Sequence, residues 1–208
     1  MAEMHTVFGM ALEQSRRFEV KALLVASNTG ASAIEARKHF GPGCPIYAVG
    51  NPTSSHDAGL VHHSGISDEA AERLREHDIT ALYHPQSLFQ KPVAHLNHKT
   101  LMELRQMMSA GQELLIEGVI YSALQLFGTG PRVCIEIAMM AGDLGVLEPG
   151  TDCISIARPG AWCNMPDASL VLTVDSTENL FRGRLRVKDV KLAPQQNDPW
   201  FTNQEVPW

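Results

Sequence analysis

The stretch KALLVASNTGASAIEARKHFGPGCPIYAVG, residues 21–50, decides the fold of this chain. Its apolar run at residues 22–26 predicts a buried strand, and a second apolar run at residues 45–49 predicts another. Between them lies a stripe of apolar residues at helical spacing, formed by Ala33, Ala36 and Phe40. The tripeptide GPG ends this helix, since glycine favours a helix end and proline cannot continue the turn. Short loops around the helix predict a parallel pair of strands joined by a right-handed crossover.

The segments on either side of this unit extend the pattern. Residues 6–18 predict a helix before it. After it, Ser67 precedes DEAAERLREHD, whose acidic residues fall in the first helical turn, where the helix dipole favours negative charge, and residues 79–83 predict a third strand. Residues 84–99 contain two prolines and little periodicity, so they predict a long loop or lid. This first half is typical of an open α/β sheet.

The second half of the chain predicts further helices and strands. Residues 113–127 (ELLIEGVIYSALQLF) are apolar on nearly every side, as in a buried central helix. Residues 132–145 (RVCIEIAMMAGDLG) fit two patterns, because their first half alternates like a strand whereas residues 138–141 favour a helix. Three strands are predicted at residues 151–157, 169–174 and 184–192. The last alternates apolar and polar residues, as an edge strand does.

The chain is expected to form a single α/β domain, residues 1–192, followed by a tail, residues 193–208. The tail is polar and contains prolines, yet it holds Trp200 and Trp208, two of the three tryptophans. A tail free in solvent would gain nothing from these side chains, so they either pack back on the same subunit or attach to a neighbouring one. The second alternative predicts a homo-oligomer.

Composition and charge exclude several classes of function. With 23 acidic and 17 basic residues the formal net charge is -6, and no segment concentrates lysine and arginine with aromatic residues, so a nucleic-acid partner is not expected. The N-terminal sequence lacks the pattern of a signal peptide, and no apolar run is long enough to cross a membrane. Four isolated cysteines predict reduced, buried thiols in a cytoplasmic protein, namely Cys44, Cys134, Cys153 and Cys163.

The turn after the first strand is rich in hydroxyl and amide side chains. Where a strand of an open α/β sheet runs into a helix, the first backbone N–H groups of that helix lack partners and favour an anion. Five residues of the turn form the predicted phosphate site: Ser27, Asn28, Thr29, Gly30 and Ser32. Glycine here would let the backbone approach the ligand, and the hydroxyls would donate to phosphate oxygens. The alternative is that Asn28 or Thr29 only caps the helix, and without a Walker A or GxGxxG motif the spacing leaves both possibilities open.

The segment LLVASNTGASAIEARKHFGPGCPIYAVG resembles the part of the pyruvate kinase C-terminal domain that binds the phosphate of a sugar-phosphate effector. It is more similar still to the stand-alone pyruvate kinase α/β-domain-like proteins, which read VASN(S/T)G at this place. The similarity continues through LFGTGPRVCIEIAMMAGDLGVL and ASLVLTV, in the second half of the chain. The catalytic barrel of pyruvate kinase has no counterpart in this sequence, so kinase activity is not implied.

The resemblance implies a three-layer α/β/α sandwich, with a mostly parallel sheet and an antiparallel edge, in which residues 132–145 form a helix. It also implies a phosphate-bearing ligand, with flavin mononucleotide (FMN) as the candidate cofactor, bound at the 27–32 turn. The turn ARPGAWCNMPDA corresponds to a second effector loop and adds three candidate ligand-binding residues: Arg158, Gly160 and Trp162. Residues 51–63 and 84–112 depart from the family pattern, which leaves the rest of the pocket, and hence the ligand, open.

Two residues are candidates for acid–base chemistry. His84 follows the third predicted strand and would face the same crevice, or else it is a surface residue that closes a turn. Glu136 stands among apolar residues, so its carboxylate must face solvent, pair or bind a proton, and a structural hydrogen bond is the alternative to catalysis. No metal site is predicted, because neither HExxH nor paired cysteines accompany the histidines that could share an ion, which are His62, His63, His95 and His98.

These observations lead to one main hypothesis about function, the binding of a phosphorylated small molecule at the 27–32 turn by a cytoplasmic protein. Two alternatives stay open. One is a flavin- or metal-dependent enzyme that uses His84 or Glu136, and the other is a regulatory or assembly module whose tail docks on a second copy. The sequence contains no complete catalytic constellation, so it does not decide whether a reaction takes place.

Overall fold

The computed structural model describes residues 2–51, 65–83, 120, 123–158, 166–177, 179 and 184–193, and the statements below concern these residues. The four helices of this part are α1 (Ala2–Arg17), α2 (Ala31–Phe40), α4 (Asp68–Glu76) and α7 (Thr129–Asp143). Its six strands are β1 (Ala22–Ala26), β2 (Ile46–Val49), β3 (Thr80–Leu82), β4 (Asp152–Ala157), β5 (Ala168–Thr173) and β6 (Arg186–Leu192).

The six strands form one mixed sheet in the order β3-β2-β1-β4-β5-β6. Strands β3, β2, β1 and β4 are parallel to one another, whereas β5 pairs antiparallel with both β4 and β6. In the central pair Val25 lies opposite Ile156. The fold class is therefore α/β with a mostly parallel sheet and an antiparallel edge, as predicted.

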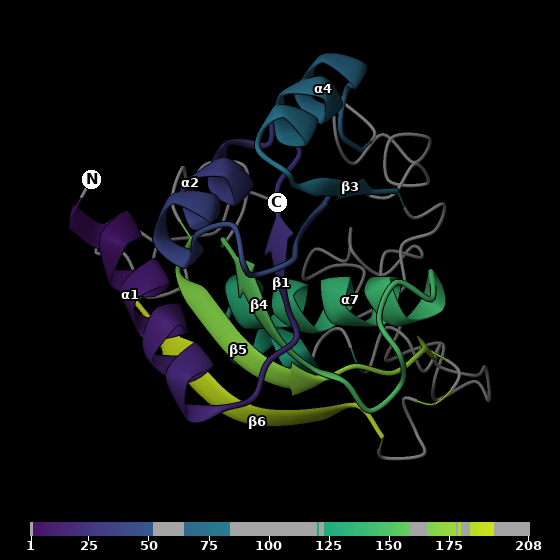
Figure 1. Ribbon diagram of the computed structural model, residues 1–208. Helices are drawn as coiled ribbons and strands as arrows, with labels where there is room; N and C mark the ends of the chain where they lie inside the picture. The colour runs from purple at the N-terminus through teal and green to yellow at the C-terminus, as the bar shows by residue number, and fades with distance from the viewer. Residues whose placement is uncertain are drawn as a thin grey trace, which may run out of the picture.

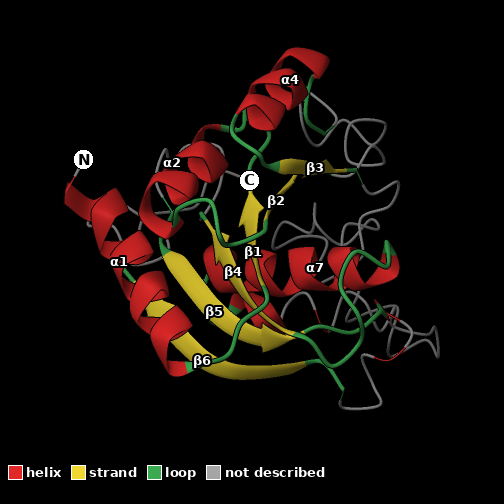
Figure 2. Ribbon diagram, in the orientation of Figure 1, coloured by secondary structure: helices red, strands yellow, loops and turns green. Residues whose placement is uncertain are grey.

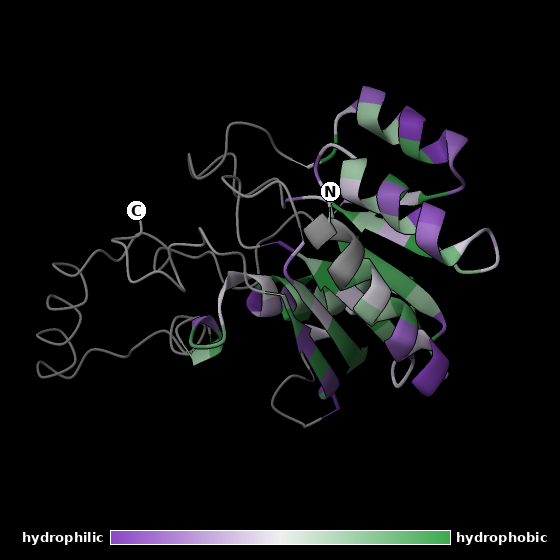
Figure 3. Ribbon diagram, turned by 90° about the vertical axis from the view of Figure 1, so that its left-hand side faces the viewer, coloured by the Kyte–Doolittle hydropathy of each residue, from purple (hydrophilic) through white to green (hydrophobic). Residues whose placement is uncertain are grey.

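Helices cover both faces of the sheet, which gives three layers (Figure 1, Figure 2). Leu23 and Val25 of β1 belong to the core on the side of α1, α2 and α4, and Leu24 belongs to the core on the side of α7. A strand that is buried on both faces reads as a continuous apolar run, which explains the sequence ALLVA. Figure 3 shows the strands mostly in hydrophobic colours and the helices with hydrophilic stretches that face outward.

Most of the predicted elements are present with small shifts of their ends. Strand β1 has the predicted bounds, α1 begins four residues earlier than predicted, and residues 132–143 lie in α7 rather than in a strand. The helix predicted at residues 113–127 is described only at residues 120 and 123–127. There Leu126 and Phe127 are 76% and 65% exposed, so the predicted burial is wrong for these two side chains. The predicted lid and the tail beyond residue 193 lie outside the described residues.

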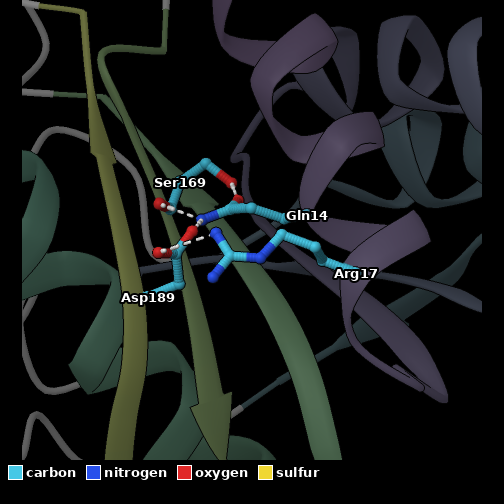
Figure 4. A network of polar contacts seen from close by, with 4 residues as sticks. All are labelled: Gln14, Arg17, Ser169 and Asp189. Atoms are coloured by element: carbon cyan, nitrogen blue, oxygen red, sulfur yellow. Dashed lines mark hydrogen bonds and ion pairs between the residues drawn. The ribbon is translucent and has the colours of Figure 1, made fainter.

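A buried amide joins α1 to the antiparallel edge of the sheet (Figure 4). The Gln14 side chain is 1% exposed, and its Nε2 donates to Asp189 Oδ2 on β6 at 2.9 Å and to Ser169 O on β5 at 3.3 Å. The Ser169 hydroxyl donates back to Gln14 Oε1 at 2.6 Å. Arg17 adds a longer ion pair to Asp189, at 3.8 Å. One side chain thus satisfies polar groups of two strands at a position that is otherwise apolar.

The C-terminal end of α2 is fastened to the turn between α4 and β3. The Arg37 guanidinium donates to four backbone carbonyls, those of Gly41, Cys44, His77 and Asp78, at 2.5–3.1 Å. Because the planar guanidinium offers five N–H donors in a fixed geometry, it can join two chain segments that are forty residues apart. Helices α2 and α4 are therefore held side by side, which matters for the site that lies at the N-terminal end of α2.

Candidate functional site

The predicted ligand-binding segments meet at one edge of the sheet. Since β1, β2, β3 and β4 are parallel, their carboxyl ends share that edge. The chain passes from β1 to β2 on one side and later returns to place β4 on the other side of β1. Helix α2 follows β1 on one face, whereas α7 precedes β4 on the opposite face. The gap between the ends of β1 and β4 is therefore the topological switch point, where ligands of open α/β sheets bind.

The loop of residues 27–32 begins at this switch point. The Ser27 N–H extends the pairing of β1 with β2 by donating to Val49 O at 3.0 Å. Gly30 is the N-cap of α2 and has a φ of 81°, a left-handed conformation that other residues adopt at a cost. The side chains of Ser27 and Ser32 are only 7% and 9% exposed. Within the described part of the chain neither hydroxyl makes a hydrogen bond, and neither is among the fully buried atoms that lack a partner.

Asn28 does not cap α2, and Thr29 makes only a long contact with the first N–H of this helix. No side chain makes a cap hydrogen bond to this helix, and Thr29 Oγ1 lies at a long 3.5 Å from the Ala31 N–H. Asn28 instead accepts a 2.8 Å hydrogen bond from the backbone N–H of Asn51, which follows β2. Its amide thus holds together the loops after β1 and β2, and leaves the first N–H groups of α2 without a capping side chain.

Three helices of the described part begin at this edge, and they differ in how their N-termini are satisfied. Helix α4 is capped by Ser67, whose hydroxyl accepts from Ala70 N at 3.2 Å, and it carries two acids in its first turn. At α7 the buried carboxylate of Asp167 lies against the first turn, where a Cβ at Gly130 would overlap Asp167 Oδ1. Helix α2 has neither a capping side chain nor an acid in its first turn. It alone among the three presents the electrostatic surroundings that favour an external anion.

Helix α4 packs directly on the 27–32 loop, which the sequence did not reveal. A Cβ at Gly30 would lie 3.1 Å from Leu74 Cγ, so the glycine makes room for α4 rather than for a ligand. One residue before Leu74, the Arg73 guanidinium donates to Thr29 O at 3.0 Å. Arg73 is an exposed residue of a polar helix face, and such a face is usually only solvated; no local signal in the sequence marks its position beside the loop.

Of the residues predicted for the second effector loop, the structure describes only Arg158. Arg158 directly follows β4. Val25 of β1 pairs with Ile156 of β4, so two residues further along the two parallel strands Ser27 and Arg158 lie side by side. The role of Arg158 as a ligand-binding residue, which the resemblance implies, stays a prediction. Gly160 and Trp162 lie outside the described residues, as does the candidate acid–base residue His84.

Glu136, the second acid–base candidate, is part of a buried polar chain on α7. Its Oε2 accepts from Arg132 Nη1 at 2.9 Å, and both side chains are less than one-tenth exposed. Arg132 Nε also donates to Gln125 Oε1 at 3.0 Å, and Gln125 Nε2 donates to Thr129 Oγ1 at 2.8 Å. A buried carboxylate that is paired one helical turn away needs no catalytic role to explain it, since breaking such a pair is strongly destabilising.

The described cysteines are free thiols without features of a nucleophile or metal ligand. Burial raises the pKa of Cys153 to about 12 and that of Cys134 well above its ordinary value, and burial also raises the pKa of the half-buried Cys44 against the opposing effect of Arg37. Thiols that resist ionisation are inert. No cluster of potential metal ligands occurs among the described residues, while His62, His63, His95, His98 and Cys163 lie outside them. The described helices are all too short or too polar to span a membrane.

Comparisons with known proteins give structural likenesses only. No family model matches the chain, and no curated protein is similar to it. Among solved structures, a pyruvate kinase from Cryptosporidium parvum is similar over 84% of this chain, with a TM-score of 0.41 and 15% sequence identity. The match covers 23% of that kinase, so the chain spans about a quarter of its length. The α/β class stated above rests on the sheet and helices of this chain, and no residue or activity is transferred from the kinase.

Proposed function

We propose that this chain is of the pyruvate kinase C-terminal domain-like type and that it binds a phosphorylated small molecule at the 27–32 loop. The observation that carries the proposal is the pair Ser27 and Ser32, two residues of low exposure whose hydroxyls make no hydrogen bond within the described residues and are open to an acceptor. A ligand with acceptor oxygens would supply the missing hydrogen bonds and so stabilise the loop.

Phosphate is the acceptor group that suits this loop best. It is anionic, and the N-terminus of α2, which no acid or capping side chain neutralises, favours an anion. It also carries several strong acceptor oxygens, which match a group of hydroxyl and backbone N–H donors. The position at the topological switch point supports the same assignment. The resemblance of residues 23–50 to a phosphate-binding segment of pyruvate kinase adds FMN as the first ligand to test.

The first experiment uses the purified full-length protein. Its absorbance spectrum is recorded, and the small molecules released on denaturation are identified by mass spectrometry. Thermal unfolding is then measured with FMN and with riboflavin, which lacks the phosphate. We expect FMN to raise the unfolding temperature and riboflavin to leave it unchanged. If neither stabilises the protein, sugar phosphates and nucleotides are compared with their unphosphorylated forms. A protein that no phosphate ester stabilises refutes the proposal.

A charge substitution tests the location of the site. In Ser32→Asp a carboxylate takes the second position of α2, where it complements the helix dipole but repels a phosphate. We expect binding to be lost while the unfolding temperature of the ligand-free protein stays the same or rises. The matched control is Lys38→Gln, which changes the net charge by the same amount at the exposed opposite end of α2. Equal affinity of Ser32→Asp and Lys38→Gln would place the ligand elsewhere.

The loop glycine is a poor position for such a test. Any side chain at Gly30 meets Leu74 and must adopt a left-handed backbone conformation. A substitution there would therefore disturb the packing of α4, and a loss of binding would not distinguish direct from indirect effects.

A further inference from the structure

We propose that Arg73 on α4 is a ligand-binding residue of the 27–32 loop and that it selects phosphate monoesters over phosphodiesters. This inference rests on the proposed function and deepens it, because it names the class of phosphate that the site takes. Its starting point is the 3.0 Å hydrogen bond from Arg73 Nη2 to Thr29 O, which holds a guanidinium at the residue before the α2 N-cap.

The charge of Arg73 is not used by a carboxylate of the described part of the chain. Helical spacing puts Glu69 and Glu76 within reach, one turn before and nearly one turn after Arg73, but no ion pair is found with either. Its neighbour on the helix behaves differently, since Arg75 pairs with Glu72. Arg73 instead turns to the loop, where it contacts a neutral carbonyl that accepts only one of its five N–H donors.

The guanidinium is held at this place by the packing of its helix. Leu74, the next residue, contacts Gly30 so closely that a Cβ there would lie 3.1 Å from Leu74 Cγ. Leu74 itself is fully buried. Arg37, near the end of α2, donates to the backbone of His77 and Asp78, which follow α4. The C-terminal part of α4 is thus attached to both ends of α2, and the position of Arg73 relative to the loop is set before any ligand arrives.

Charge then decides which phosphate fits. A monoester carries about -1.5 to -2 charges at neutral pH because its second pKa is near 6. A diester has only one ionisable oxygen and carries about one negative charge. The α2 N-terminus alone acts as roughly half a positive charge, which suits a single negative charge, whereas an added guanidinium provides a full charge and a planar fork that binds phosphate oxygens in pairs. With Arg73 beside the loop, the dianion is favoured.

The test compares methyl phosphate with dimethyl phosphate, two probes too small to depend on the rest of the pocket. Their dissociation constants are measured at pH 8 by thermal-shift titration of the full-length wild type, Arg73→Gln and Arg75→Gln. Glutamine at position 73 removes the charge and keeps an amide donor on a shorter side chain. Arg75→Gln is the control, since it removes the same charge from the same helix on a side chain that pairs with Glu72.

We expect the wild type and Arg75→Gln to bind methyl phosphate about tenfold or more tightly than dimethyl phosphate. In Arg73→Gln we expect methyl phosphate to bind about tenfold more weakly, with little change for dimethyl phosphate, so that the preference disappears. If Arg73→Gln keeps the wild-type preference, or weakens both probes equally, Arg73 only positions the loop and the inference is wrong while the proposed function stands. If the wild type binds neither probe at tens of millimolar, the phosphate site itself is refuted, and the inference with it.

Discussion

Replacement of Gln14 by leucine tests how the N-terminal helix is attached to the sheet. The amide makes three hydrogen bonds to β5 and β6, at 2.6, 2.9 and 3.3 Å, and its side chain is 1% exposed (Figure 4). Leucine has nearly the same volume, so Gln14→Leu removes the hydrogen bonds without leaving a cavity. What remains is the Ser169 hydroxyl, fully buried and without its acceptor.

The expected loss of stability follows from these contacts. Three hydrogen bonds at a net value of about 1 kcal/mol each give about 3 kcal/mol, and the unsatisfied Ser169 hydroxyl makes up a large share of it. In Gln14→Leu combined with Ser169→Ala that hydroxyl is gone, and two apolar side chains meet instead. We therefore expect the free energy of unfolding to fall by about 3 kcal/mol in Gln14→Leu, by about 1.5 kcal/mol in Ser169→Ala and by only about 2.5 kcal/mol in the double variant. The coupling energy is then about 2 kcal/mol.

Urea unfolding of the four proteins in this cycle, followed by circular dichroism, measures these free energies. In thermal unfolding, Gln14→Leu alone should lower the midpoint by about 6–12 °C for a chain of this size. Ser15→Ala is the control, because the Ser15 hydroxyl bonds only within its own helix, to Leu12 O, and its loss should cost less than about 0.5 kcal/mol. If the losses of stability in Gln14→Leu and Ser169→Ala add up to that of the double variant within about 0.5 kcal/mol, the two residues do not share a buried hydrogen-bond network.

Two further predictions concern glycines and thiols. Gly142→Ala should destabilise the protein by roughly 3 kcal/mol or more, because the added Cβ would overlap the backbone carbonyl of Asp175. Gly9→Ala, within α1 and with open space around the glycine, should stabilise the protein by about 0.5–1 kcal/mol. Urea unfolding measures both changes. At pH 8 an aromatic disulfide reagent should modify Cys134 and Cys153 only after unfolding, because burial raises the pKa of both thiols, to about 12 for Cys153. The folded-state pKa of Cys153 exceeds its ordinary value of 9.0, so above pH 9 the thiol ionises more readily in the unfolded chain than in the folded one. The free energy of unfolding should therefore decrease as the pH rises from 9 toward 12. The urea midpoint should fall over that range and stay constant from pH 7 to 8.5.

The local structure of this chain could be predicted well because local signals agree with one another. The apolar run before the 27–32 loop predicted β1 with its observed bounds, and Ser67 caps α4 as its sequence indicates. Residues 132–145 were ambiguous, since a strand buried on one face and a helix buried on nearly every side share apolar residues. The helix is observed, and its near-complete burial explains the mixed signal. The exposure of Leu126 and Phe127 was missed because apolar sequence alone does not say which residues end a helix.

The candidate site was predictable only in its local part. The hydroxyl-rich loop follows β1 in the sequence, and the neighbouring position of Arg158 was expected from the resemblance. The contribution of α4 was not, because the pairs Thr29–Arg73 and Gly30–Leu74 are each 44 residues apart and depend on how α4 packs beside α2. The same holds for Gln14 and Ser169, which are 155 residues apart. Contacts of this kind follow from strand order and layer packing, which periodicity does not encode.

The composition of the 27–32 loop can now be assigned to separate tasks. Asn28 holds the loop to the strand beside it through Asn51, Gly30 provides the left-handed turn against α4, and the Thr29 carbonyl receives Arg73. These three contacts hold the backbone of the loop. A loop that served only as a connection would have no further need for Ser27 and Ser32, whose hydroxyls make no hydrogen bond within the described residues and are open to a ligand. The residues that hold the loop and the residues available to a ligand are therefore different ones, which is the arrangement expected of a preorganised binding site.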